Sequence, residues 1–157
     1  MRIEYPAEDF GFLFDFISEA QEHLSNIEDN LLKLESDNTN ESLIEAIYRP
    51  MHSIKGMAGF VNINSIKHLC HETEDLIDCI RNRKITIDPK IVDTIIRVGD
   101  RLNKMIKSVI AVAEPLRNQK LDKYVIDLPE IDYADLIEEL QILKNASKQP
   151  TKQQTKT

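Results

Sequence analysis

Four long stretches of the sequence place apolar residues three or four positions apart, which is the repeat of a helix with one buried face. They cover residues 7–35, 40–61, 65–82 and 88–114, and the connections between them are short. Helices with one apolar stripe each must bury those stripes against one another. The pattern therefore predicts an all-α fold, an antiparallel four-helix bundle. In the first stretch the stripe consists of Phe10, Leu13, Phe14, Ile17, Leu24, Ile27, Leu31 and Leu34.

Two of the predicted helices carry clear start signals. Asn40 is placed to cap the second helix, and Asp88 followed by Pro89 is an N-cap and first-turn pair for the fourth. The segment "DFGFLFDFI" also alternates between apolar and polar residues as a strand does. The apolar repeat that follows it is too long for a strand, so the segment is predicted to be helical. Phe12 and Phe16 fall beside the main stripe. The sequence leaves open whether they widen the core contact or form an exposed docking edge.

The pattern weakens after Pro115 and returns in "DYADLIEELQILK", which predicts a fifth, shorter helix over 132–144 packed on the outside of the bundle. The final "ASKQPTKQQTKT" is polar, contains proline and lacks apolar anchors, so it is expected to be a flexible linker or tail. The predicted organisation is thus a bundle over 1–114, a connecting segment with the fifth helix over 115–145, and a tail over 146–157.

Length and charge narrow the possible functions. A chain of 157 residues suits one domain, and its formal net charge of -7 argues against nucleic acid or an anionic membrane as a partner. No apolar run or basic leader indicates a membrane span or a secretion signal, which favours a cytoplasmic protein.

Cys70 and Cys79 lie about 13 Å apart along one predicted helix and cannot pair with each other. They are expected to be buried thiols.

The segment "MHSIKGMAGF" puts an unusual set of residues on one helix face. At 100° per residue, His52, Lys55, Gly56 and Gly59 form a ridge opposite the apolar side of the helix. Each glycine costs about 1 kcal/mol relative to alanine in a helix, so two of them need a reason. Gly56 and Gly59 are expected to give access beside the imidazole, and Lys55 can place an ammonium near an anion held there. The alternative is an ordinary surface histidine, with glycines that merely permit close helix packing.

The third helix carries a polar side that contains His71, Glu74 and Asp78 at three- and four-residue spacing. A carboxylate that accepts a hydrogen bond from one imidazole nitrogen fixes the tautomer and leaves the other nitrogen with a free lone pair. An ordinary solvated acidic face is the simpler interpretation. A metal site in "HLCHETE", using His68 and its neighbours, is a further alternative, although no second Glu-x-x-His pattern accompanies it.

The segment "HSIKGMAG" resembles the phosphorylation motif of histidine-containing phosphotransfer (HPt) domains, and in particular the N-terminal phosphotransfer domain of the CheA family of chemotaxis histidine kinases. The segments "EAQEHLSNIEDNLLKLE" and "HLCHETEDLIDCIR" extend the resemblance over most of the chain. The resemblance implies that His52 accepts a phosphoryl group and that Lys55 and Gly56 are the lysine and first glycine of the motif. It also implies that Glu74 orients the imidazole and that His71 is a second histidine near the site.

Two positions depart from the family pattern. Asn62 stands where a glycine is common, and asparagine tolerates the positive φ that this turn requires. Pro50 lies two residues before His52, where it removes one backbone hydrogen bond. We therefore expect a kink in this helix, at a cost of about 3 kcal/mol if nothing compensates for it.

The resemblance implies a phosphocarrier in two-component signalling: a kinase phosphorylates His52, and an aspartate of a response regulator then takes the group. The chain has no glycine-rich nucleotide loop, so it is not expected to be an enzyme or to bind a cofactor itself. ATP and Mg²⁺ would come from the kinase domain, in cis or in trans, and Mg²⁺ also from the response regulator. The polar tail favours the N-terminal domain of a CheA-like kinase. A free-standing HPt protein and a purely structural helical bundle are the alternatives.

Overall fold

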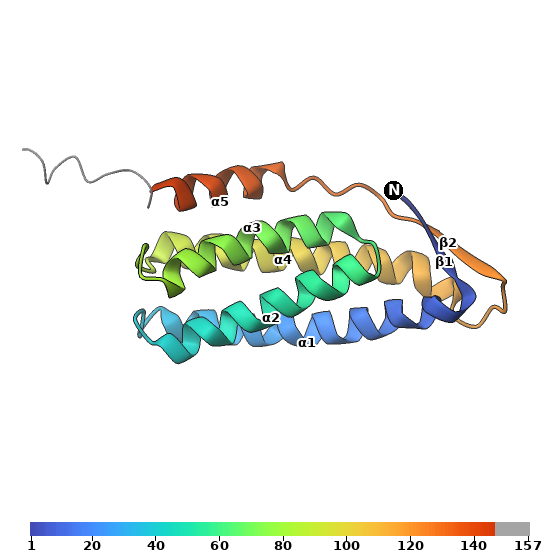
Figure 1. Ribbon diagram of the computed structural model, residues 1–157, viewed down its shortest axis with the longest axis horizontal. Coiled ribbons are helices and arrows are strands. Elements are labelled where there is room, and N and C mark those ends of the chain that lie inside the picture. Colours follow the sequence, from blue (N-terminus) through green and yellow to red (C-terminus); the bar gives the residue numbers. More distant parts are fainter. Residues whose placement is uncertain (147–157) are drawn as a thin grey trace, which may run out of the picture.

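The computed structural model describes residues 1–146, and in this part of the chain four long helices lie side by side as an antiparallel bundle (Figure 1). A fifth helix packs on the outside of the bundle, against the third and fourth helices. The predicted all-α bundle is therefore confirmed, with helix ends within three residues of those expected. The helices are α1 (Phe10–Leu34), α2 (Glu41–Phe60), α3 (Asn64–Arg81), α4 (Pro89–Ala113) and α5 (Ala134–Ala146), with short 3-10 turns η1 (Ala7–Asp9) and η2 (Glu114–Leu116).

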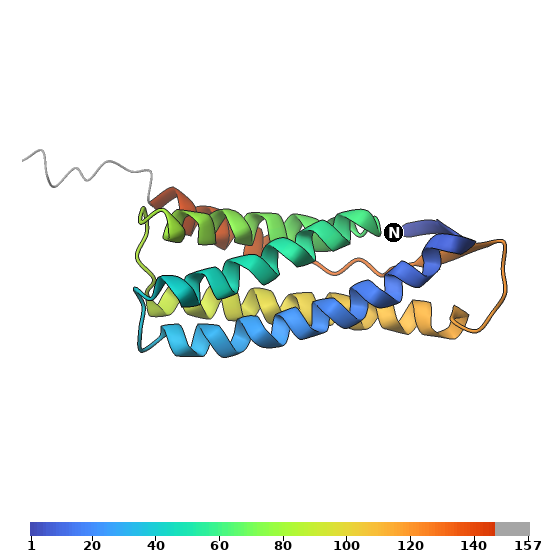
Figure 2. The same ribbon diagram turned by 60° about the horizontal axis from the view of Figure 1, so that its bottom comes forward.

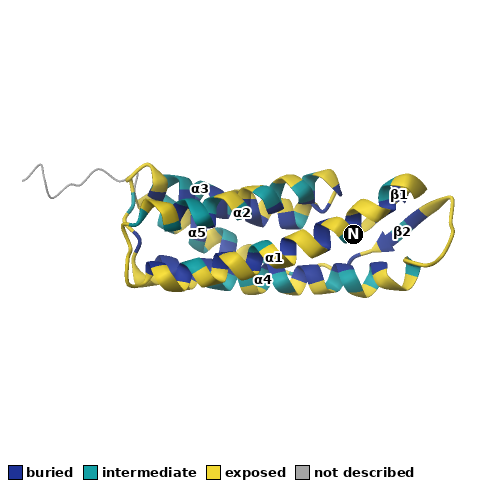
Figure 3. Ribbon diagram, turned by 90° about the horizontal axis from the view of Figure 1, so that it is seen from below, coloured by how far each residue is buried: buried dark blue, intermediate teal, exposed yellow. Residues whose placement is uncertain are grey.

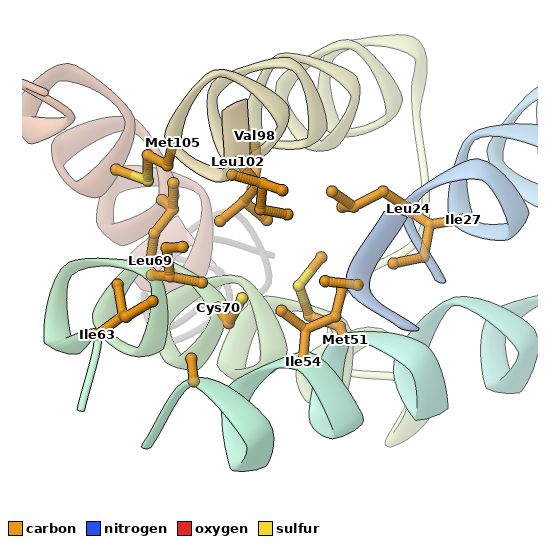
Figure 4. Close-up of a cluster of buried hydrophobic side chains, with 14 of the residues drawn as sticks. Leu24, Ile27, Met51, Ile54, Ile63, Leu69, Cys70, Val98, Leu102 and Met105 are labelled. Atoms are coloured by element: carbon orange, nitrogen blue, oxygen red, sulfur yellow. The ribbon is translucent and has the colours of Figure 1, made fainter. Parts of the chain in front are cut away.

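Each long helix turns one apolar face inward, and the buried and exposed residues alternate around the bundle (Figure 3). Apolar side chains from the four helices meet in the centre of the bundle (Figure 4). Two leucines of α5 are also fully buried, which fixes this helix on the bundle. The central residues labelled in Figure 4 are Leu24, Ile27, Met51, Ile54, Ile63, Leu69, Cys70, Val98, Leu102 and Met105.

The two phenylalanines that the sequence left undecided have different environments. Phe16 is buried in the core with 2% of its surface exposed, whereas Phe12 remains 44% exposed. The ring of Phe12 contacts Phe60 of α2 edge-on, at a centroid distance of 5.3 Å. Phe16 thus widens the core contact, and Phe12 lies at the surface.

A short strand pair that the sequence did not predict lies beside the start of α1 (Figures 1 and 2). Strand β1 (Arg2–Pro6) pairs antiparallel with β2 (Lys123–Asp127), with Tyr5 opposite Tyr124. The Tyr5 hydroxyl donates a hydrogen bond to the carbonyl oxygen of Val61, just after α2. The pair therefore ties both flanking segments to the helices. Each strand has five residues, too few for the alternation to stand out in the sequence.

The turns around α2 agree with the residues that form them. The Asn40 side chain accepts a hydrogen bond from the Leu43 backbone N–H at 3.2 Å, and Asn62 adopts a φ of 64°, as expected for its turn. Helix α2 continues through Pro50 to its end at Phe60, and the expected kink remains a prediction.

Both cysteines were expected to be buried. Cys70 is buried, whereas Cys79 is only partly buried.

The remaining expectations concern the membrane and the tail. Within residues 1–146, no helix has the length and apolar character needed to cross a bilayer. The predicted tail lies almost wholly outside the described residues.

We expect Asp88→Ala to lower the free energy of unfolding by about 1 kcal/mol. The Asp88 carboxylate accepts a hydrogen bond from the Ile91 backbone N–H at 2.8 Å, and alanine would leave this donor of α4 without a partner. Urea denaturation measures the change. Asp93→Ala, at an exposed position of the same helix, is the control and should change stability by less than about 0.5 kcal/mol. Equal losses in the two variants would contradict the capping role.

Candidate functional site

His52 lies on the outer face of α2, with 58% of its side chain exposed. The opposite face of the helix places Met51, Ile54 and Ala58 in the core, and all three are fully buried. Burial of that face fixes the rotation of α2, and the rotation presents the imidazole to solvent. The ridge predicted from the sequence is thus present at the surface of the bundle.

Glu74 of α3 is the direct partner of this imidazole. Its residue surface is only 8% exposed, and its Oε2 lies 3.0 Å from Nδ1 of His52. An ionised carboxylate can only accept hydrogen bonds, so Nδ1 carries the proton. In the neutral imidazole, the Nε2 nitrogen therefore keeps its lone pair, as a nucleophile requires.

Lys55 completes this group from the next turn of α2. Its ammonium lies 2.9 Å from Oε1 and 2.8 Å from Oε2 of Glu74, and 20% of its side chain is exposed. The carboxylate is thus shared between a cation and the imidazole. Lys55 has three N–H donors, which leaves capacity for an anion beside the ring.

The electrostatics of the group favour an ionised Glu74. Burial would raise the pKa of this carboxyl group, but the hydrogen bonds from Lys55 and His52 outweigh burial, and the pKa lies below its ordinary value of 4.5. The folded protein therefore releases this proton more readily than the unfolded chain. The resulting stability is fully present above the unfolded pKa and is lost as the pH falls through the folded pKa.

We expect Glu74→Gln to be less stable than the original protein at about pH 7 and to lose this disadvantage in acid, because glutamine does not titrate. The free energy of unfolding, measured in urea at about pH 7 and about pH 3, gives the difference between the two proteins at each pH. Glu22→Gln, at an exposed position of α1, should show no such change in the difference. A Glu74→Gln difference that stays constant would contradict the lowered pKa.

The two glycines of the ridge have different surroundings. A Cβ at Gly56 would meet no atom within 4 Å, so the space one turn beyond His52 is open. A Cβ at Gly59 would lie 3.3 Å from Cδ of Lys67, which crosses this position from α3. Gly56 therefore leaves room beside the imidazole, whereas Gly59 accommodates a neighbouring side chain.

Two other predicted residues of α3 have ion-pair partners outside this group. His71 is 53% exposed in its side chain and pairs with Asp75 at 3.6 Å, while Asp78 pairs with Arg81. The side chains of "HLCHETE" also diverge: His68 contacts the Tyr133 hydroxyl, and Cys70 is in the core. Among residues 1–146, no three His, Cys, Asp or Glu side chains gather as a metal site would require.

Tyr48 is a member of the site that the sequence analysis missed. Its hydroxyl lies 3.4 Å from Oε1 of Glu74, and its ring stacks with the imidazole of His52 at a centroid distance of 6.0 Å. The four-residue spacing from Tyr48 to His52 puts both on one helix face, and this was the available signal. Tyrosine at such spacing is usually a packing residue, so the sequence alone did not single it out.

Comparison with known proteins places these residues in a family context. The family model described as "Hpt domain" matches residues 11–112. "Chemotaxis protein CheA" of Treponema pallidum is 36% identical over 96 residues, which are 61% of this chain and 12% of that protein. The protein of the same name from Bacillus subtilis is 34% identical over 99 residues, or 63% of this chain and 15% of that protein. The chain thus spans about one-seventh of the length of these curated relatives.

Solved structures agree with the sequence comparisons. The "CheA phosphotransferase domain from Thermotoga maritima" superimposes with a TM-score of 0.62 and 34% identity, over 64% of this chain and 96% of that one. The "phosphorylated P1 domain of CheA3 in complex with CheY6 from R. sphaeroides" gives a TM-score of 0.73 over 88% of this chain and 98% of that one. At 18% identity, the second match shows a common fold.

Proposed function

Since this chain belongs to the Hpt domain family, we propose that it carries a phosphoryl group in two-component signalling, with His52 as the acceptor. The observation that carries the proposal is the pairing of an exposed imidazole with a nearly buried carboxylate, Nδ1 to Oε2 at 3.0 Å. In the neutral imidazole this pairing leaves the lone pair on Nε2, and the exposed side chain opens that nitrogen to solvent. The carrier unit is the bundle of residues 1–114, on which α5 packs.

In the first transfer, the Nε2 lone pair attacks the γ-phosphorus of ATP held by a histidine kinase. A P–N bond forms, the bond between phosphorus and the bridging oxygen breaks, and ADP leaves. Glu74 stabilises the positive charge that develops on the ring, and its hydrogen bond keeps the Nδ1 proton in place. We assign Lys55 to charge neutralisation beside the new phosphoryl group, since its ammonium already lies next to the ring partner.

In the second transfer, an aspartate carboxylate of a response regulator attacks the phosphorus and the P–N bond breaks, which restores neutral His52. The carrier contributes position and charge rather than catalysis of its own. We propose that ATP and Mg²⁺ are supplied by the kinase domain and Mg²⁺ also by the response regulator. The P1 domain of CheA3, which shares this fold, was solved phosphorylated and in complex with CheY6.

The curated relatives suggest the setting. Chains named chemotaxis protein CheA contain a region similar to this one within much longer proteins. We therefore propose that the chain acts as the phosphotransfer domain of a CheA-like chemotaxis kinase and serves as that kinase's internal substrate.

The proposal is tested by mixing the chain with Mg²⁺, ATP labelled in the γ-phosphate, and CheA of Treponema pallidum or Bacillus subtilis from which the matching region has been removed. We expect one labelled group per chain, stable in base and lost in acid, as a phosphorus–nitrogen bond requires. Addition of a response regulator should remove the label. The absence of label with both kinases, or an acid-stable label, would contradict the proposal.

A further inference from the structure

Tyr48 and Arg81 form a cluster beside the site that the transfer mechanism has not used. The Arg81 guanidinium carbon lies 3.9 Å from the centre of the Tyr48 ring, in a cation–π contact. The tyrosine in turn contacts both partners of the site, the imidazole of His52 through its ring and the carboxylate of Glu74 through its hydroxyl. Tyr48 thus connects the site to a charged group on α3.

We propose that Tyr48 is a positioning residue for phosphoryl transfer, whose ring and hydroxyl hold the His52 imidazole and the Glu74 carboxylate in the orientation that leaves Nε2 free. This inference rests on the proposed function and adds to it a residue that touches neither ATP nor phosphorus. Tyr48 acts through its two neighbours.

The need for such a residue follows from the exposure of the imidazole. One hydrogen bond at Nδ1 fixes a point on the ring but leaves rotation about the axis of that bond. With 58% of its side chain in solvent, His52 has few packing contacts to restrict this rotation. The Tyr48 ring lies nearly parallel to the imidazole, with 11° between the planes, in the offset arrangement that aromatic pairs favour. This stacking restricts the plane of the imidazole.

The hydroxyl of Tyr48 acts on the second partner. It donates to Oε1 of Glu74 at 3.4 Å, while Nδ1 of His52 binds Oε2 at 3.0 Å. The two contacts lie at different oxygens and therefore oppose rotation of the carboxylate. Burial, followed by the nearby charge of Glu74, raises the pKa of Tyr48, so the hydroxyl remains protonated and can donate.

Arg81 keeps the Tyr48 ring in place. Its Nε lies 2.7 Å from Oε1 of Glu45 on α2, and its Nη1 lies 3.2 Å from Oδ1 of Asp78 on its own helix. Two carboxylates on two helices thus fix the guanidinium over the ring. A guanidinium held in this way stabilises the aromatic face more than a mobile cation would.

The test compares two substitutions of Tyr48. Tyr48→Leu keeps apolar volume but removes the flat ring and the hydroxyl, and Tyr48→Phe restores the ring alone. We expect the kcat of phosphorylation by the CheA-derived kinases to fall about 3- to 10-fold in Tyr48→Leu, with KM for the chain unchanged. Tyr48→Phe should recover most of this loss, because the hydroxyl bond is long.

A second readout does not depend on any kinase. The ¹⁵N NMR shifts of the His52 imidazole should show one tautomer in the original protein, with the proton on Nδ1, and a mixture of tautomers in Tyr48→Leu. Tyr133→Phe is the matched control, because the Tyr133 hydroxyl lies 3.0 Å from Nδ1 of His68, in a pair that includes no residue of the site. It should alter neither measurement.

Each outcome decides the inference. Unchanged kcat in Tyr48→Leu, or a lower kcat with unchanged imidazole shifts, would overturn the positioning role. If the original protein accepts no phosphoryl group, the proposed function fails. The NMR comparison would then still decide whether Tyr48 orients the ring. The two failures are therefore distinguishable.

Discussion

We expect His52→Gln to lose phosphoryl incorporation completely, a fall of more than about 1000-fold to the background of the assay. The amide nitrogen of glutamine has no lone pair available for attack, because that pair is delocalised into the carbonyl. The side chain is nonetheless polar and of similar length, and it can still hydrogen-bond with Glu74. The variant therefore removes the nucleophile and leaves the surroundings in place.

Folding should be almost unaffected by this change, since the His52 side chain is 58% exposed. We expect the free energy of unfolding to change by less than about 0.5 kcal/mol. His23→Gln, on α1, is the control and should accept label at the original rate. Acid-labile label on a folded His52→Gln protein would show that another residue is the acceptor.

The second large effect is expected for Glu74→Ala, which should lower the rate of phosphorylation by about 10- to 100-fold, the range seen when a carboxylate that orients a metal-binding histidine is removed. Alanine leaves Nδ1 without an acceptor, so the proton is free to occupy either nitrogen. It also releases the Lys55 ammonium, which binds both carboxylate oxygens within 3 Å. Single-turnover labelling with the same kinases measures the rate.

One further variant separates orientation of the imidazole from the charge of the carboxylate, and a second is the control. Glu74→Gln keeps an oxygen that can accept from Nδ1 and should lose less activity than Glu74→Ala. Glu72→Ala removes a carboxylate of α3 that pairs with Lys144 of α5 instead of the site, and it should retain the original rate. Equal rates for Glu74→Ala and the original protein would show that the pairing is structural.

Much of the candidate site could be inferred from the sequence because it depends on the geometry of single helices. His52, Lys55 and Gly56 share one face of α2 by spacing alone, and the open space at Gly56 agrees with that expectation. The resemblance to the HPt family added Glu74 as the carboxylate partner. It also suggested His71 as a second histidine near the site; the structure pairs His71 with Asp75, and its role at the site remains a prediction.

Tyr48 and Gly59 show why the rest could not be inferred. The contact of Tyr48 with Glu74 joins α2 to α3, and the role of Gly59 depends on where Lys67 of α3 crosses it. Both depend on the rotation and axial register of one helix against another. Sequence periodicity reports which face of a helix is buried but not which residue of the neighbouring helix lies opposite.

Residues close together in the chain were enough to determine the helices, their caps and the exposed histidine ridge, because helical geometry relates positions a few residues apart. Packing between distant segments determined the β1–β2 pair, the burial of Phe16 beside an exposed Phe12, and the Tyr48–Arg81 cluster. The strand pair and the Tyr48–Arg81 cluster join segments that are far apart in the sequence. For Phe12 and Phe16, packing decides which of two neighbouring faces of α1 is buried. Their free energy depends on how whole helices fit together, which no local pattern records.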